Sequence, residues 1–185
     1  MIRLLKNRLA LSTVITTLII LVVSVLLAGV VTYFAINVTS TRVQEESLSL
    51  SKQHIWVDSA AKVEGAMMIT NTGGRDVVLD KITVRGQECA WTKVFYAVAN
   101  VTKDDLTADL VYKTAPVAAA ANIGLNATAT AATGDLVLPS GTTIVVYINS
   151  PDSVTINDIG QTFSFTVYTS QAVYYKETNI QAAVT

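Results

Sequence analysis

The sequence predicts an α+β chain, with a long N-terminal hydrophobic α-helix followed by an all-β sandwich head. The first observation behind this is a 33-residue run without any charged side chain, from Leu9 to Thr41. The second is a change of period after the run, from helical to alternating. The third is that the later alternating segments are short and separated by turn residues.

The uncharged run is long enough to cross a lipid bilayer, whose apolar core needs about 20 helical residues. Arg3, Lys6 and Arg8 precede it, and all 14 acidic residues follow it. The positive-inside rule therefore places the N-terminus in the cytoplasm and the rest of the chain outside. Three interpretations of this segment remain open: a cleaved signal peptide, a permanent single-span anchor, and a prepilin-type leader whose helix stays on the mature protein. A cleaved signal peptide has an apolar region of only about 7–15 residues, much shorter than this run.

The start of the run carries a family resemblance. The segment Arg8-Leu9-Ala10-Leu11-Ser12-Thr13-Val14-Ile15 continues as TTLIILVVSVLLAGVV. It resembles the N-terminus of archaeal type IV pilin-like and archaellin-like filament subunits, in which a short basic class III signal peptide ends in a small residue. The resemblance implies cleavage between Ala10 and Leu11 by a prepilin-type peptidase. Leu9 departs from the family pattern by separating Arg8 from Ala10, and Ile15 stands where bacterial pilins carry glutamate.

Small residues are spaced along the predicted helix in a way that favours helix packing. Ser24, Ala28 and Thr32 recur every four residues and share one face, and Gly29 adds a second small residue beside Ala28. Small side chains allow helix backbones to approach closely in a membrane. The polar segment after Ser40 contains neither Pro nor Gly up to Lys52. With the cleavage position that the resemblance implies, we expect a leader over 1–10, a helix over 11–52 and a head over 53–185.

The head shows the alternation of β-strands. Phe163, Phe165 and Val167 alternate with polar residues, and we expect Phe165 to lie in the core. Further strands are predicted over 63–71, 77–84 with a bulge near Asp80, and the ranges 91–99, 110–112, 143–148 and 173–175. The ranges 71–74 and 139–141 carry turn signals. The range 114–135 lacks large apolar anchors, so we expect a long surface excursion there.

The segment Ile69-Thr70-Asn71-Thr72-Gly73, with the following VVLDKITV, resembles the heads of archaeal pilins and archaellins. The resemblance implies an immunoglobulin-like β-sandwich. It also implies a homopolymeric filament, a dedicated assembly machinery and a role in surface adhesion. The precursor would lie in the cytoplasmic membrane, and the mature subunit would lie in an extracellular filament.

Three sequons mark candidate N-glycosylation sites at Asn37, Asn100 and Asn126. Catalytic, cofactor and metal sites are not expected, because the chain has one cysteine, Cys89, and one histidine, His54. We interpret His54 as a residue at the start of a strand. Residues 43–185 hold nine cations and fourteen acids, a formal charge of −5, which argues against a nucleic-acid partner.

Two alternatives to a pilus-like filament remain open at this point. The first is a monomeric, membrane-anchored binding module that keeps its leader. The second is an archaellum subunit, which would have a similar fold. An enzyme is a remote further alternative, because no cluster of titratable residues stands out.

Overall fold

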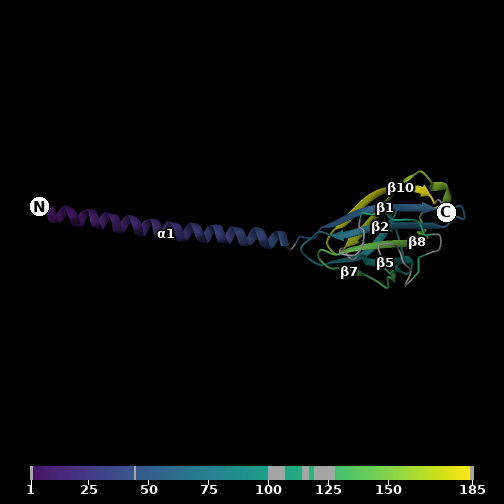
Figure 1. Cartoon of the computed structure of the whole chain (residues 1–185), viewed down its shortest axis with the longest axis horizontal. Coiled ribbons are helices and arrows are strands. Elements are labelled where there is room, and N and C mark those ends of the chain that lie inside the picture. Colours follow the sequence, from purple (N-terminus) through teal and green to yellow (C-terminus); the bar gives the residue numbers. More distant parts are fainter. Residues whose placement is uncertain (1, 44, 100–106, 114–116, 119–127, 184–185) are drawn as a thin grey trace. The chain divides into compact units, whose positions relative to one another are not determined.

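The computed structural model describes residues 2–43, 45–99, 107–113, 117–118 and 128–183. The chain forms two compact units, residues 1–43 and 44–185 (Figure 1). The first unit is one helix, α1 (Ile2–Val43). The second unit is the head, and its regular elements in order are β1 (Leu48–Val57), β2 (Val63–Asn71), β3 (Val77–Val84), β4 (Gln87–Glu88), η1 (Trp91–Lys93), β5 (Val94–Ala99), β6 (Thr130–Ala131), β7 (Leu136–Leu138), β8 (Thr143–Asn149), η2 (Ile156–Asp158), β9 (Thr162–Thr169) and β10 (Val173–Ala182).

The expected fold class is confirmed, because an apolar helix precedes a head built from strands. Nine of the ten strands are hydrogen-bonded in the order β4-β3-β9-β10-β1-β2-β8-β5-β6. The tenth, β7, pairs with the first three residues of β3, Val77–Leu79. Strands β1 and β10 are parallel over Ile55–Val57, and the remaining pairs are antiparallel. The outermost strands, β4 and β6, contain two residues each.

The main core contains side chains from both halves of this curled sheet. Leu79, Phe165 and Val167 come from β3 and β9, and Met67 and Ile148 come from β2 and β8. Phe165 is completely buried, as the alternation predicts. A Cβ added to Gly65 would lie 3.1 Å from the Phe165 ring. Because Gly65 on β2 has no side chain, the Phe165 ring can pack against its backbone.

A second apolar cluster lies on the opposite face of β1, β2 and β8. It includes Trp56, Met68 and Tyr147, with Leu110 and Val117 from the segment between β5 and β6. Both faces of β2 and β8 are thus buried, whereas β1 is buried on both faces only over Ile55–Val57. This explains why β8 reads as a continuous apolar run rather than as an alternating one.

The helix boundary differs from the sequence prediction. Helix α1 ends at Val43, not at residue 52. Leu48 is the first residue of β1, and it pairs with Asn71 on β2. The head therefore begins at Gln44 rather than at residue 53. Leu48 is buried in the main core, so the tertiary contacts of this segment outweigh its local compatibility with helix.

Other differences are local. Residues 110–112 form no strand, and His54 lies inside β1 rather than at its start. The expected excursion over 114–135 is partly anchored, because Ala129 and Ala132 are buried and β6 pairs with β5. The rest of that range lies outside the described residues. The predicted bulge is confirmed by a register shift between Leu79 and Lys81.

Candidate functional site: an exposed apolar helix and its junction with the head

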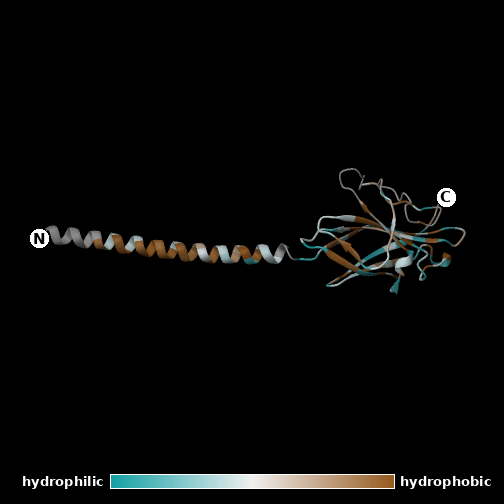
Figure 2. Ribbon diagram, turned by 90° about the horizontal axis from the view of Figure 1, so that it is seen from below, coloured by the Kyte–Doolittle hydropathy of each residue, from teal (hydrophilic) through white to brown (hydrophobic). Residues whose placement is uncertain are grey.

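Helix α1 exposes apolar side chains on all sides (Figure 2). Every side chain from Leu11 to Thr41 is exposed, and among the large apolar ones the exposed fraction ranges from 44% at Val38 to 73% at Tyr33. By length and composition, Leu11–Thr41 can cross a membrane, and an N-terminal signal sequence would have the same properties. Such a surface requires a lipid or protein environment, because exposed apolar area is unfavourable in water.

The predicted packing face lies on this exposed surface. Ser24, Ala28 and Thr32 are exposed along α1, with Gly29 beside Ala28. The Ser24 hydroxyl donates to the Ile20 carbonyl oxygen at 2.7 Å, and the Thr32 hydroxyl donates to the Ala28 carbonyl oxygen at 2.7 Å. These hydroxyls are therefore satisfied within the helix and can face an apolar neighbour at low cost.

The other sequence-predicted positions are less informative. The bond between Ala10 and Leu11 lies inside α1, which continues across it. Asn37 is exposed on the same helix. Asn100 and Asn126 lie outside the described residues.

The start of the head is held by the turn between β2 and β3. The amides of Thr72 and Gly73 donate to the Ser47 carbonyl oxygen at 2.9 and 3.1 Å, and the Gly74 amide donates to the Glu45 carbonyl oxygen at 3.3 Å. Only Gln44 separates Glu45 from the last residue of α1.

Asn71 holds this turn in shape. It is completely buried, and its side-chain amide donates to the carbonyl oxygens of Arg75 and Leu138 at 2.8 and 3.0 Å. Its side-chain oxygen accepts from the Gly73 amide at 3.0 Å. The Asn-x-Gly sequence predicts a turn, and the structure gives the physical reason. The Asn71 side chain supplies hydrogen-bond partners for backbone groups of Gly73, Arg75 and Leu138.

Glu64 is a buried carboxyl group that the strand pattern does not predict. Glu64 on β2 is 3% exposed and accepts a hydrogen bond from the Lys113 amide at 3.3 Å. Burial raises the pKa of Glu64 to about 7. A signal existed in the sequence, since Glu64 is the single charge in a strand that otherwise reads Val-Gly-Ala-Met-Met-Ile.

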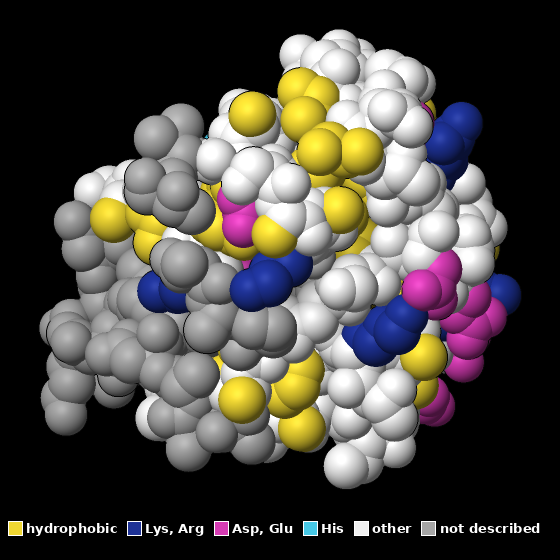
Figure 3. All heavy atoms as spheres, turned by 90° about the vertical axis from the view of Figure 1, so that its right-hand side faces the viewer, with side chains coloured by type: hydrophobic (Ala, Val, Ile, Leu, Met, Phe, Trp, Pro, Cys, Tyr) yellow, Lys and Arg dark blue, Asp and Glu magenta, His cyan; other side chains and the backbone are white. Residues whose placement is uncertain are grey.

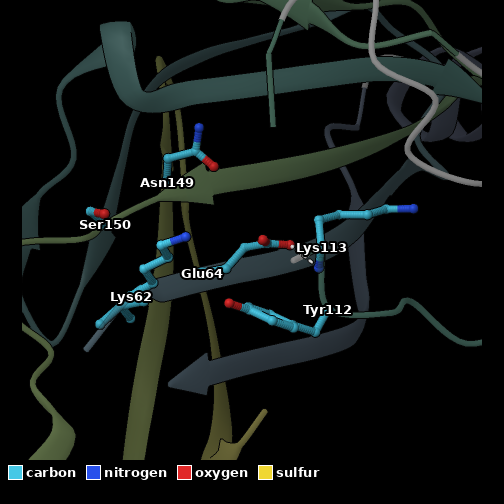
Figure 4. Close-up of a pocket in the computed structure, with 7 residues that line it drawn as sticks. Lys62, Glu64, Tyr112, Lys113, Asn149 and Ser150 are labelled. Carbon is cyan, nitrogen blue, oxygen red and sulfur yellow. Dashed lines mark hydrogen bonds between the residues drawn. The ribbon is translucent and has the colours of Figure 1, made fainter. Parts of the chain in front are cut away.

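A cavity of about 80 Å³ adjoins Glu64 (Figure 4). Its polar lining includes Lys62, Tyr112, Lys113 and Asn149. The Asn149 side chain is already engaged, because it bonds both the amide and the carbonyl group of Val117. Among the described residues, no group of three or more His, Cys, Asp or Glu side chains is arranged to hold a metal ion.

The end of the head shown in Figure 3 carries cationic, acidic and apolar side chains in small separate groups. Lys93 and Asp152 form one of the ion pairs in the head, at 2.6 Å. Among the described side chains of this face, both signs of charge are present.

No family model matches the chain. No curated protein matches its sequence either. Solved structures with a detectable similarity include an apo PmoF2 PCuAC domain, at 12% identity and a TM-score of 0.44, covering 77% of this chain and 98% of that one.

Two others are the Pseudomonas fluorescens alkylpurine DNA glycosylase AlkC bound to DNA containing an abasic site analog and a β-glucosidase from Listeria innocua in complex with glucose. Their identities are both 11%, their TM-scores are 0.30 and 0.28, and they cover 73% and 76% of this chain. The chain spans only 30% and 16% of the length of these two proteins. All three TM-scores are too low for the similarities to assign a family or an activity.

Proposed function

We propose that this chain is the structural subunit of an extracellular filament of the archaeal type IV pilus-like kind, with a role in surface adhesion. The observation that carries the proposal is the exposed apolar surface of α1, uncharged from Leu9 to Thr41. In the precursor this surface would be covered by lipid. In the filament it would be covered by the α1 helices of other copies.

The small-residue face supports association between helices. Ser24, Ala28 and Thr32 present short side chains, and a Cβ added to Gly29 would meet no atom within 4 Å. Because lipid and leucine side chains are equally apolar, helices gain little from hydrophobicity when they associate in a membrane. Close backbone approach at small residues supplies that gain through van der Waals contact.

The short connection to the head also favours a filament over a loose tether. Anchored domains commonly use flexible Gly- and Ser-rich linkers. Here only Gln44 lies between Val43, the end of α1, and Glu45, which is hydrogen-bonded to the turn after β2.

The second candidate is a membrane-anchored monomer, and it rests on the same helix. Leu11–Thr41 satisfies the length and composition of a single membrane span. In that case lipid alone would cover α1, the leader would be retained, and the small face would have no partner.

The two functions are separated by Ala28→Phe. The substitution keeps the segment apolar, so membrane insertion should persist, but the ring would prevent close helix contact. The matched control is Leu26→Phe, because residues two positions apart lie about 200° apart around a helix. Leu26 is also exposed, at 64%.

A filament subunit predicts that Ala28→Phe accumulates in the membrane fraction and that surface filaments disappear in electron micrographs. Leu26→Phe should retain filaments. If both variants assemble normally, this face is not a packing surface. If the unmodified strain has abundant protein in membranes and no filaments, the anchored monomer is the correct function.

A further inference from the structure

Residues 107–113, here called the strap, lie over the outer face of β1, β2 and β8. Leu110 from the strap is buried in the second apolar cluster beside Trp56 and Tyr147. The Tyr112 ring lies 6.3 Å from the Trp56 ring, between ring centres. The strap therefore covers apolar surface that β1 and β8 would otherwise expose.

Side chains of three strands hold the strap. From β1, the Lys52 ammonium group donates to the Ala108 carbonyl oxygen, and His54 pairs with Asp109. From β8, the Tyr147 hydroxyl donates to the Val111 carbonyl oxygen at 3.0 Å. From β2, Glu64 Oε1 accepts from the Lys113 amide at 3.3 Å. One of these four attachments, Glu64, is made by a carboxyl group, which can gain or lose a proton.

Glu64 is an almost completely buried attachment, with only 3% of the residue exposed. Figure 4 shows its carboxyl group directed toward Lys113 of the strap, and Tyr112 lines the same cavity. The charged and titratable groups around it are Lys113 and Tyr112 from the strap, Lys62 before β2, and Tyr147 from β8. Burial dominates the balance and raises the pKa of Glu64, although the amide and the charge of Lys113 both lower it.

His54 on β1 forms a further polar attachment, to Asp109 of the strap. Its Nε2 lies 2.9 Å from Asp109 Oδ1, and the hydrogen bond from His54 lowers the pKa of Asp109. An ionised carboxylate only accepts hydrogen bonds, so Nε2 carries the proton. The further charged group near this pair is Lys52.

We propose that Glu64 is a proton-operated latch for the strap: its neutral carboxyl group keeps the strap closed, and its ionisation favours an open strap. The reason is solvation. A carboxylate in the closed state is removed from water, whereas opening of Tyr112 and Lys113 returns water to it. Opening would bare an apolar face that includes Trp56, Met68 and Tyr147.

The pH range of the latch follows from the pKa of Glu64 in the closed state and its pKa in the open state. The pKa of Glu64 is about 7 in the closed state, against 4.5 for a hydrated glutamate. Closure is therefore most favourable below pH 4.5 and loses its advantage as the pH rises to 7. Linkage gives an opening constant that rises about tenfold per pH unit in this range, roughly 300-fold in total, and then stays level.

The test is hydrogen exchange of the strap amides in the full-length chain in detergent micelles, followed from pH 5 to 8.5 and corrected for intrinsic exchange. Protection of the strap should fall about tenfold per pH unit up to pH 7 and then remain constant. Glu64→Gln keeps the acceptor for the Lys113 amide and cannot ionise. Its strap protection should be high and independent of pH.

Two further variants separate the latch from other effects. Glu88→Gln removes an exposed carboxylate on β4 and should behave like the unmodified chain. Asp109→Asn weakens the His54 attachment, so protection should fall at every pH while its pH dependence persists. If amides of the main core lose protection in parallel with the strap, the transition is global and the latch is wrong.

A fluorescence measurement keeps the proposal testable if Glu64→Gln fails to fold. Trp56 and Trp91 are the only tryptophans, so Trp91→Phe leaves Trp56 as the single reporter under the strap. Acrylamide should quench Trp56 increasingly as the pH rises from 5 to 7. A quenching constant that does not change over this range overturns the proposal.

Discussion

Gly73 lies against the backbone of Glu45, so closely that a Cβ added to Gly73 would lie 2.6 Å from the Glu45 carbonyl oxygen. The same Cβ would lie 2.7 Å from the Ser47 amide nitrogen. Both obstacles are backbone atoms and cannot rotate away. Gly73 therefore provides the space in which the chain enters the head.

Gly73→Ala should destabilise the head, because the turn and the entering chain must separate. We expect a loss of about 1–3 kcal/mol in the free energy of unfolding, the usual range for overpacking. Chemical denaturation followed by circular dichroism measures it. The matched control is Gly134→Ala, whose added Cβ would meet no atom within 4 Å. Equal stability of the two variants would contradict the close approach at Gly73.

Phe165→Ala should destabilise the head by about 3–5 kcal/mol, the range for removing a fully buried phenylalanine. Phe165 is completely buried, and its ring packs against Gly65. Thr166→Ala, at the next position on β9, is the control, because Thr166 is only partly buried and should change stability by less than about 1 kcal/mol. A loss below about 1 kcal/mol for Phe165→Ala would place the ring outside the core.

The Cys89 thiol should react slowly in the native protein. It is buried, and burial raises its pKa to about 11, against 9.0 for the free group. Only the thiolate is nucleophilic, so at pH 8 the native thiol should react about 100-fold more slowly with a disulfide reagent than the denatured one, from its pKa alone. Spectrophotometric thiol titration with and without denaturant measures both rates. Comparable rates would show that the site is open.

Replacing Arg3, Lys6 and Arg8 by glutamine should impair membrane orientation and processing, because these cations favour the cytoplasmic side. The readouts are a membrane-fraction blot and N-terminal sequencing of the mature protein. In the unmodified strain we expect the mature chain to begin at Leu11. Normal amounts of mature protein in the triple variant would contradict the role given to the basic segment.

The sequence predicted those elements whose signals are local. Strand β2 matches the prediction from Val63 to Asn71, and the Asn71 turn and the bulge near Asp80 also agree with the structure. In each case residues close in sequence carry the information: alternation, a turn-forming asparagine, or a change of phase.

The errors concern segments that depend on distant contacts. Helix α1 ends nine residues before the predicted position. The polar segment after Ser40 is compatible with helix, and its residues from Leu48 onward become a strand because they pair with β2. The strap was predicted as a strand at Leu110–Tyr112, whereas side chains of β1, β2 and β8 hold it as an irregular segment. Glu64 meets this segment at the Lys113 amide, 49 residues away in sequence, and periodicity alone could not reveal such a contact.

The shortness of β4 and β6 affects how the heads behave when crowded. Free strand edges are templates for cross-β aggregation, in which chains add through their backbones without end. The edge strands of the described sheet have only two or three residues: Gln87–Glu88 and Leu136–Leu138 beside β3, and Thr130–Ala131 beside β5. So short an edge gives an incoming strand few backbone partners, and amyloid-like stacking is disfavoured even where many heads are held side by side.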